Sequence, residues 1–268
     1  GTCQDGIVNG PEVCDGAAPV GESCVDYGWN RGTLGCTEWC TPGFSGCEYI
    51  GWRPVSLAAT QDIHAVWGTG PDNVYAVGDF ETVRRFNGTA WVNDATGLAG
   101  HFHGVWGSGP NDVYVVGSGS GVYHNDGTGW SPVTTSAQAT VRSIWGTGAD
   151  NVLIGDEDGY IHRFDGATWA PMTTASAGAI TAIWGSSPSD VYAVGSSLIH
   201  YTGTTWDSVP GGPSGAINAL WGSGANDIFG VGDSGYIVHF DGATWSTMSP
   251  VTEGSLHGVW GFGPDDVF

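Results

Sequence analysis

The sequence contains no lysine. Its six basic residues are all arginine, and they face 27 aspartates and glutamates, which gives a formal charge of -21. Binding to the phosphate backbone of DNA or RNA requires a positive surface, so the charge excludes nucleic-acid partners. No stretch of 18 apolar residues occurs, so we expect no membrane span. The acidic surface is explained either by solubility or by binding of divalent cations.

Cysteine is absent after residue 48. The six cysteines are Cys3, Cys14, Cys24, Cys36, Cys40 and Cys47. An even number in a stretch with little apolar material predicts a small module, residues 1–48, held by three disulfides in one of fifteen pairings. Disulfides persist in oxidising compartments, so we expect a secreted or cell-surface protein. No signal peptide is present, and we therefore expect that the chain begins after a processing site.

The remainder, residues 49–268, is organised by tryptophan. The pair Trp-Gly recurs at Trp67, Trp106, Trp145, Trp184, Trp221 and Trp260, with spacings of 39, 39, 39, 37 and 39 residues. A second series precedes the first by 15 residues each time, at Trp52, Trp91, Trp130, Trp169, Trp206 and Trp245. Such regularity indicates an internal repeat.

Each repeat contains four short β-rich runs separated by turn residues, and none has helical periodicity. In the first unit these runs begin near Ile63, Val74, Thr82 and Trp91, and the last turn is Asn87-Gly88. Four strands in about 39 residues predict one blade of an all-β propeller. The two-residue deletion in the fourth unit is predicted near Gly195.

The ends of the array predict how the propeller closes. Residues 52–55 match a fourth strand, and residues 256–268 match a first strand and the start of a second. We expect these to share one blade, which gives five full blades and an incomplete sixth. Six blades are therefore expected, and a seventh is compatible with a chain that continues beyond Phe268.

Two motifs carry a resemblance to known proteins. Residues 105–117, Val-Trp-Gly-Ser-Gly-Pro-Asn-Asp-Val-Tyr-Val-Val-Gly, followed later by Asp-Gly-x-x-Trp, resemble the tandem Trp-Gly propeller repeats of secreted proteins from myxobacteria and their relatives. The stretch from Cys3 to Gly16 resembles the short cysteine-rich repeats on the same kind of exported bacterial protein. The resemblance implies extracellular or surface placement and a multidomain architecture, and it implies little about a ligand.

The amino-terminal module contains a candidate calcium site. Asp5, Asn9, Glu12 and Asp15 bring four oxygen donors into eleven residues, and the interleaved glycines allow the backbone to fold around an ion. The spacing is not that of an EF-hand. Ordinary turn and capping roles are the alternative, so calcium is the only cofactor we consider.

A second candidate set has one member in the third strand of each blade. Arg85, His124, Arg163, His200 and His239 each stand six residues before the closing tryptophan. Such groups are either cross-strand or inter-blade partners of a repeated aspartate, or a ring of equivalent pockets that contact sugars or anions.

A third series lies three residues before Trp-Gly on each first strand. Its members are His64, His103, Arg142, Thr181, Asn218 and His257, and they face the central channel if the first strand lines it. Their variation argues against a designed metal site. The repeated tryptophans are interpreted as packing between blades, although indoles also stack on sugars.

No catalytic motif is present. The sequence has no Gly-x-Ser-x-Gly, phosphate loop or His-Glu-x-x-His, and its arginines do not form the cluster that a sialidase needs. We therefore expect a non-enzymatic module that binds a glycan or an extracellular protein for adhesion. The alternative is a structural subunit of an exported assembly that self-associates by strand exchange at the incomplete blade. A glycan-hydrolysing propeller is the third interpretation.

Overall fold

The computed structural model describes residues 61–94, 97–174, 178–250 and 252–268, together with short pieces at 31–32, 34–36, 42–43, 47–48 and residue 57. The chain divides into two compact units, Gly1–Ser56 and Leu57–Phe268. Within the described ranges, no helix is long and apolar enough to cross a membrane.

The amino-terminal unit contributes two small antiparallel sheets. Strand β1 (Arg31–Gly32) pairs with β4 (Cys47–Glu48), and β2 (Gly35–Cys36) pairs with β3 (Pro42–Gly43). Cys36 is disulfide-bonded. The three-disulfide framework stays a prediction, because most of this unit lies outside the described residues.

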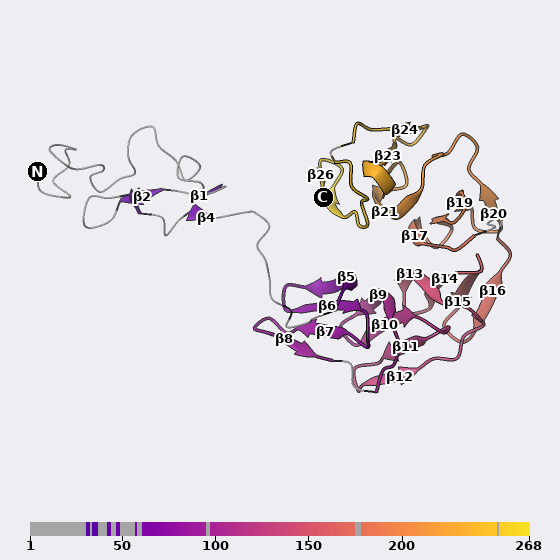
Figure 1. Ribbon diagram of the computed structural model, residues 1–268, viewed down its shortest axis with the longest axis horizontal. Helices are drawn as coiled ribbons and strands as arrows, with labels where there is room; N and C mark the ends of the chain where they lie inside the picture. Colours follow the sequence, from indigo (N-terminus) through magenta and orange to yellow (C-terminus); the bar gives the residue numbers. More distant parts are fainter. Residues whose placement is uncertain are drawn as a thin grey trace, which may run out of the picture. The chain divides into compact units, whose positions relative to one another are not determined.

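The second unit consists of five four-stranded antiparallel sheets, which we number as blades 1–5 (Figure 1). Blade 1 contains β5 (Ile63–Gly70), β6 (Asn73–Gly78), β7 (Val83–Phe86) and β8 (Trp91–Asn93). Blade 2 contains β9 (Phe102–Gly109), β10 (Asp112–Gly117), β11 (Val122–Asn125) and β12 (Trp130–Pro132). Blade 3 contains β13 (Val141–Gly148), β14 (Asn151–Asp156), β15 (Ile161–Phe164) and β16 (Trp169–Met172).

Blade 4 contains β17 (Ala182–Ser187), β18 (Asp190–Val194), β19 (Leu198–Tyr201) and β20 (Trp206–Ser208). Blade 5 contains β21 (Ile217–Gly224), β22 (Asp227–Gly232), β23 (Ile237–Phe240) and β24 (Trp245–Thr247), with the 3₁₀ turn η2 (Asp233–Gly235) between its second and third strands. In each blade the strands pair in sequence order, and the first strands of successive blades contact one another. The blades therefore follow one another around a common centre, as Figure 1 shows.

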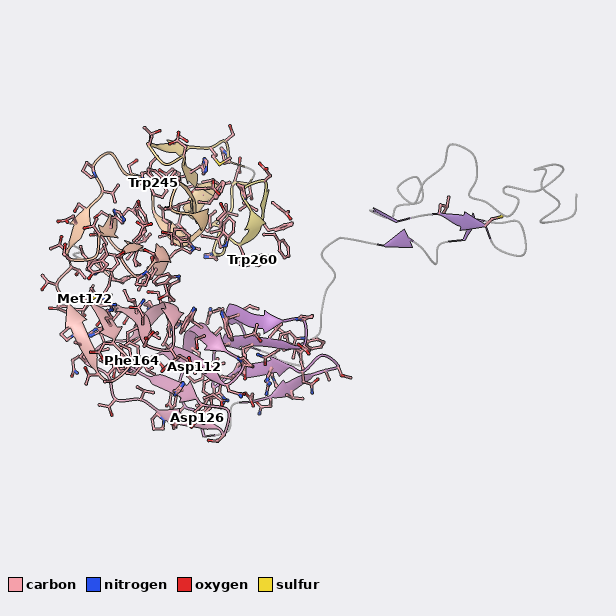
Figure 2. All side chains as sticks on the ribbon, turned by 180° about the vertical axis from the view of Figure 1, so that it is seen from behind. Asp112, Asp126, Phe164, Met172, Trp245 and Trp260 are labelled. Atoms are coloured by element: carbon pink, nitrogen blue, oxygen red, sulfur yellow. The ribbon has the colours of Figure 1, made fainter. Side chains whose placement is uncertain are left out.

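The expectation of six or seven blades was wrong for this structure, which has five. After blade 5 only β25 (Gly261–Gly263) and β26 (Asp266–Val267) form, as a two-stranded sheet. These residues supply the first two strands of a unit and no more. The predicted closing strand at Trp52 lies outside the described residues. Figure 2 labels Trp260 just ahead of this last sheet.

The Trp-Gly pair joins neighbouring blades. The indole of each blade packs on the glycine of the next, so that a β-carbon placed on Gly146 would lie 2.6 Å from Cη2 of Trp106, and one on Gly185 would lie 2.7 Å from Cη2 of Trp145. The same contact joins Trp67 to Gly107, Trp184 to Gly222 and Trp221 to Gly261. Only a glycine leaves room for the ring, which explains why the two residue types recur together.

The second tryptophan series also packs between blades. Trp130 of blade 2 meets Tyr75 of blade 1 edge to face at 6.1 Å, and Trp245 of blade 5 meets Tyr192 of blade 4 in the same way at 6.0 Å. Each of the four core clusters combines residues from two neighbouring blades. The interpretation of these indoles as packing residues is therefore confirmed, because the core lies between the sheets.

The turns match their sequence signals. The hairpins between the third and fourth strands carry Gly88, Gly127, Gly166, Gly203 and Gly242, all with φ between 88° and 96°. In four of these hairpins the preceding residue accepts a backbone N–H bond: Asn87, Asp126, Asp165 and Asp241. The shorter fourth unit loses its residues between β18 and β19, at Gly195–Ser197, as predicted.

Candidate functional site

A hydrogen-bonded triad lies at the turn between the first two strands in blades 2, 4 and 5. In blade 2, His124 Nε2 donates to Asp112 Oδ1 at 2.6 Å, and Ser108 Oγ donates to Asp112 Oδ2. The equivalent triads are Ser186, Asp190 and His200 in blade 4, and Ser223, Asp227 and His239 in blade 5. The carboxylate accepts from both partners, so the histidine bonds the aspartate and not the serine, and the order of a Ser–His–Asp hydrolase triad is not formed.

Blades 1 and 3 replace all three members together. In blade 1, Arg85 Nε donates to Asn73 Oδ1 at 2.8 Å, and Asn73 Nδ2 donates to Thr69 Oγ1 at 2.9 Å. Blade 3 has Thr147, Asn151 and Arg163 at the same positions, and Asn151 Nδ2 donates to Thr147 Oγ1 at 2.8 Å. Blades 1 and 3 thus have an arginine with a neutral amide, and blades 2, 4 and 5 have a histidine with a carboxylate. In blade 3 the arginine and the amide do not bond, because among the described residues Asn151 Oδ1 and Arg163 Nε are buried without a hydrogen-bond partner.

In four blades the histidine or arginine of the third strand packs on an aromatic ring of the second strand. His124 stacks on Tyr114 at 4.2 Å, His200 on Tyr192 at 4.1 Å and His239 on Phe229 at 4.4 Å. The Arg85 guanidinium lies 5.6 Å from the ring centre of Tyr75. Burial, and next the charge of Asp112, raise the pKa of Tyr114 to about 12, so this phenol stays protonated at neutral pH.

Four of the five residues singled out from the sequence bond a side chain of the neighbouring strand, and Arg163 Nε is buried without such a bond. The structure gives each histidine an aspartate partner within its own blade, on the neighbouring strand. Their side chains stay about one quarter exposed, at 25% for His124 and 27% for His200 and His239. A ligand-binding role for Arg85, His124, Arg163, His200 and His239 stays a prediction.

A double-mutant cycle separates the two interpretations of these residues. We expect Asp112→Ala and His124→Ala each to lower the free energy of unfolding by about 1–2 kcal/mol, and the double variant to lose about 1 kcal/mol less than their sum. Urea unfolding measures all three values. Asp126→Ala, which removes a nearby turn carboxylate, is the control. Strictly additive losses would mean that the pair does not act as a structural unit.

The opposite ends of the first strands converge on the central channel. We call the side of the second unit that carries the second-to-third-strand turns the loop face. A depression of ≈ 170 Å³ is lined there by residues of all five first strands, among them His103, Arg142, Thr181 and Asn218. The prediction that the third series faces the channel is therefore confirmed for these four members.

Three members of this series have an acid fifteen residues later, on the turn of the loop face. His64 Nε2 donates to Asp79 Oδ1 at 2.9 Å. Arg142 Nε donates to Glu157 Oε1 at 2.9 Å, and Asn218 Nδ2 donates to Asp233 Oδ1 at 3.0 Å. The three carboxylates form what we call the acidic rim. This pairing was not predicted from the sequence, although the shared spacing of fifteen residues is visible there.

The acidic rim is held ionised. Hydrogen bonds from His64, and next from His101, lower the pKa of Asp79. Hydrogen bonds from Arg142 and from Asn218 lower the pKa of Glu157 and of Asp233, respectively.

His103 has the opposite setting within the same depression. Burial lowers the pKa of His103, and the charge of Arg142 adds to that effect. At neutral pH Arg142 is therefore the permanent cation among the lining residues of the depression, and it is bonded to Glu157.

A buried relay holds the loop face of blade 3. Ser136 Oγ donates to His162 Nδ1 at 2.7 Å, and His162 Nε2 donates to Asp156 Oδ2 at 2.9 Å. Asp156 Oδ1 also accepts from the backbone N–H of Asp158 and Tyr160. The side chains of His162 and Asp156 are only 4% and 2% exposed, so the relay joins the loop that enters blade 3 to the turn after β14.

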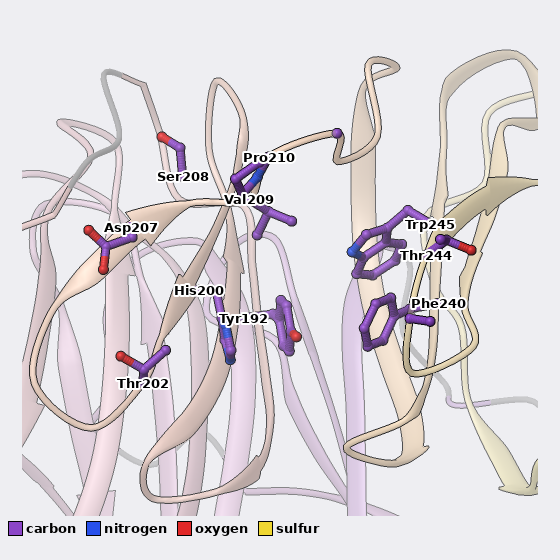
Figure 3. Close-up of a pocket in the computed structure, with 12 residues that line it drawn as sticks. Tyr192, His200, Thr202, Asp207, Ser208, Val209, Pro210, Phe240, Thr244 and Trp245 are labelled. Carbon is purple, nitrogen blue, oxygen red and sulfur yellow. The ribbon is translucent and has the colours of Figure 1, made fainter.

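A pocket of ≈ 500 Å³ opens between blades 4 and 5 (Figure 3). Its walls are Tyr192 and His200 from blade 4 and Phe240 and Trp245 from blade 5. One of the five candidate residues, His200, therefore borders a pocket large enough for a small ligand.

The candidate calcium ligands Asp5, Asn9, Glu12 and Asp15 lie outside the described residues, and calcium stays a prediction. Among the residues that the structure describes, no group of three or more His, Cys, Asp or Glu side chains is arranged to hold a metal ion.

No protein-family model and no curated protein matches the chain. Solved structures do match. YCF48 from Cyanidioschyzon merolae has a TM-score of 0.62 and 18% identity over 81% of this chain and 84% of that one. YCF48 bound to D1 peptide has a TM-score of 0.54 and 17% identity over 82% of this chain and 92% of that one. The WD40 β-propeller domain of Doa1 has a TM-score of 0.62 and 14% identity over 75% of this chain and 72% of that one.

At these identities the comparisons show the fold alone. The four-stranded sheets, their sequence-ordered pairing and the similarity to these structures together show that the second unit of this chain is a β-propeller.

Proposed function

We propose that this chain is a non-enzymatic, protein-binding propeller that takes a basic side chain of its partner at the channel depression of the loop face. The observation that carries the proposal is the acidic rim next to that depression. Glu157 and Asp233 bond its lining residues Arg142 and Asn218, and the charge of Asp79 acts on the lining residue His103. A volume of ≈ 170 Å³ is smaller than a typical small-molecule pocket and suits one long side chain. The overall charge of -21 favours approach of a basic partner.

One of the similar structures supports a protein ligand in general terms. It is YCF48 bound to D1 peptide, so a propeller of related architecture binds a peptide. The six cysteines and the bonded Cys36 support placement outside the cytoplasm.

The relay in blade 3 does not favour catalysis. Its order of serine, histidine and aspartate is that of a hydrolase triad, but a hydrolase also needs free N–H donors for the oxyanion. The backbone N–H of Ala137, next to Ser136, already donates to Thr135 Oγ1 at 3.2 Å. We therefore propose a structural role for it.

Two substitutions with opposite charge effects test the binding proposal. The probe is a lysine-containing decapeptide, compared with its glutamate counterpart by calorimetry at low salt. We expect Glu157→Gln to weaken binding of the lysine peptide about threefold and Arg142→Gln to strengthen it about threefold, because the first removes an attractive charge and the second a repulsive one. Equal losses in both variants, or tighter binding of the glutamate peptide, would contradict the proposal.

The same titration has an expected pH dependence. The pKa of His103 lies below its ordinary value, because burial and the charges of Arg142 and His64 disfavour its protonated form. The charges of Asp79 and Glu157 act in the opposite direction but are the smaller effects. Protonation adds a positive charge beside the bound side chain. Affinity for the lysine peptide should therefore be constant above about pH 6.5 and fall as the pH drops through the pKa of His103. His103→Gln should remove that fall.

A second candidate, a structural subunit completed by a strand from another copy, is favoured by apolar exposure at both ends of the blade series. Val66 on β5 is 64% exposed, whereas Val105 and Leu220 at the same repeat position are 7% and 8% exposed. At the other end, Phe262 is 77% exposed. Light scattering at about 10–100 μM, concentrations at which a stable interface is populated, should then show a dimer or larger species, and a clean monomer would exclude this candidate.

A further inference from the structure

The pocket between blades 4 and 5 is separate from the channel depression, so a ligand bound there is independent of the proposed function. Its floor is aromatic. Tyr192 is 5% exposed and meets Trp245 edge to face, and Phe240 stacks on Trp245 at 5.2 Å. Exposed polar groups border the pocket, namely Thr202, Asp207 and Thr244 (Figure 3).

An indole N–H at this pocket lacks an acceptor. Within the described residues, Trp245 Nε1 is buried and has no hydrogen-bond partner. At the equivalent position in blade 2, Trp130 Nε1 donates to Asp94 Oδ2 of blade 1 at 3.2 Å.

The acceptor is missing because the position three residues after the closing tryptophan is apolar in the repeat, with Val133, Met172, Val209 and Met248, and Asp94 is the exception. Asp94 stands three residues after Trp91, and the residue three after Trp206 is Val209. Figure 3 shows the indole nitrogen of Trp245 turned toward Val209. An unsatisfied buried N–H is costly, so a ligand oxygen that enters beside Val209 gains a bond that blade 2 makes internally.

We infer that this pocket binds a neutral sugar that carries an acetamido group. The acetamido carbonyl accepts from Trp245 Nε1 once the neighbouring Pro210–Gly211 turn shifts to admit it, and its methyl packs against Val209 and Phe240. The sugar hydroxyls donate to Asp207 and bond Thr202 at the rim. Aromatic faces suit the C–H side of a sugar ring, and the charge of -21 disfavours acidic sugars.

The Asp207 carboxylate at the edge of this pocket favours a sugar over a proline-rich peptide as the ligand. Such peptides bind aromatic grooves through their carbonyls and bring few donors, whereas each sugar hydroxyl donates. Asp207 already accepts one hydroxyl bond, from Thr205 Oγ1 at 2.8 Å, which shows that its geometry suits hydroxyl donors.

The test compares N-acetylglucosamine with glucose, which differ at the acetamido group, by calorimetry and ligand-observed NMR on the whole chain. We expect a dissociation constant on the order of 0.1–1 mM for N-acetylglucosamine and binding at least about tenfold weaker for glucose. Equal binding of the two sugars, or no binding at about 20 mM, overturns the inference. Binding of a proline-rich peptide in place of the sugar overturns it in favour of a peptide groove.

Three variants locate the site. Trp245→Phe keeps an aromatic wall and removes the N–H, and Val209→Asp supplies the internal acceptor that Asp94 supplies in blade 2. Each should weaken N-acetylglucosamine binding about tenfold. Trp169→Phe, the same change in blade 3, should leave binding unaltered. Thermal melting shows that each variant is folded. If Trp245→Phe and Val209→Asp both bind N-acetylglucosamine with wild-type affinity, the sugar does not bind in this pocket and the inference is wrong.

Discussion

Replacing Gly222 with alanine should lower the free energy of unfolding by about 3 kcal/mol, the upper end of the usual cost of overpacking a core. A β-carbon at this position would lie 2.6 Å from Cη2 of Trp184 and 2.6 Å from the carbonyl oxygen of Asp227. The first obstacle is a large ring wedged between two blades, and the second is backbone, so neither moves cheaply. Urea unfolding followed by tryptophan fluorescence measures the loss.

The control lies two residues along the same strand. Gly224 has no atom within 4 Å of its would-be β-carbon, and its φ is not in the left-handed region. Gly224→Ala should therefore change stability by less than about 0.5 kcal/mol. If both variants lose the same free energy, the contact between indole and glycine is not what holds blades 4 and 5 together.

His162→Ala should be the most damaging change on the loop face, with a loss of about 3–5 kcal/mol. The substitution leaves the Asp156 carboxylate buried, at 2% side-chain exposure, without its imidazole partner, and it frees the Ser136 hydroxyl. The matched control is His239→Ala. Its partner Asp227 is 21% exposed, and water can replace the lost bond, so a cost of about 1 kcal/mol is expected there.

A second substitution checks the physical reason. Asp156→Asn removes the charge that His162 compensates, so the double variant with His162→Ala should be more stable than His162→Ala alone by about 1 kcal/mol or more. A double variant that is less stable than either single variant would show that the imidazole acts by packing and not by pairing with a buried charge.

The strands and hairpins of the second unit were predictable because their signals are local and repeated. The spacing of the two tryptophan series, the short β-rich runs and the glycine turns predicted four strands per unit, and the structure has them in all five blades. Even the two-residue deletion was placed correctly between β18 and β19, since the distance from Trp206 to Trp221 was unchanged.

The candidate site was only partly predictable. The sequence showed that Arg85 and His124 occupy one repeat position. Their partners Asn73 and Asp112 lie on a neighbouring strand, so the strand register determines which side chains pair. The absence of an acceptor for Trp245 involves Val209, 36 residues earlier in the neighbouring blade, a relation that no local pattern contains.

The sequence by itself determined that this chain repeats a four-stranded unit, because a periodic placement of indoles, glycines and turns leaves a chain little other way to bury its apolar residues. Only the tertiary structure decided that no sixth blade follows the five, which partner each basic side chain meets, and where pockets open between sheets. Those outcomes depend on how side chains from separate blades fit together, and fit is a property of the packed interface rather than of any one repeat.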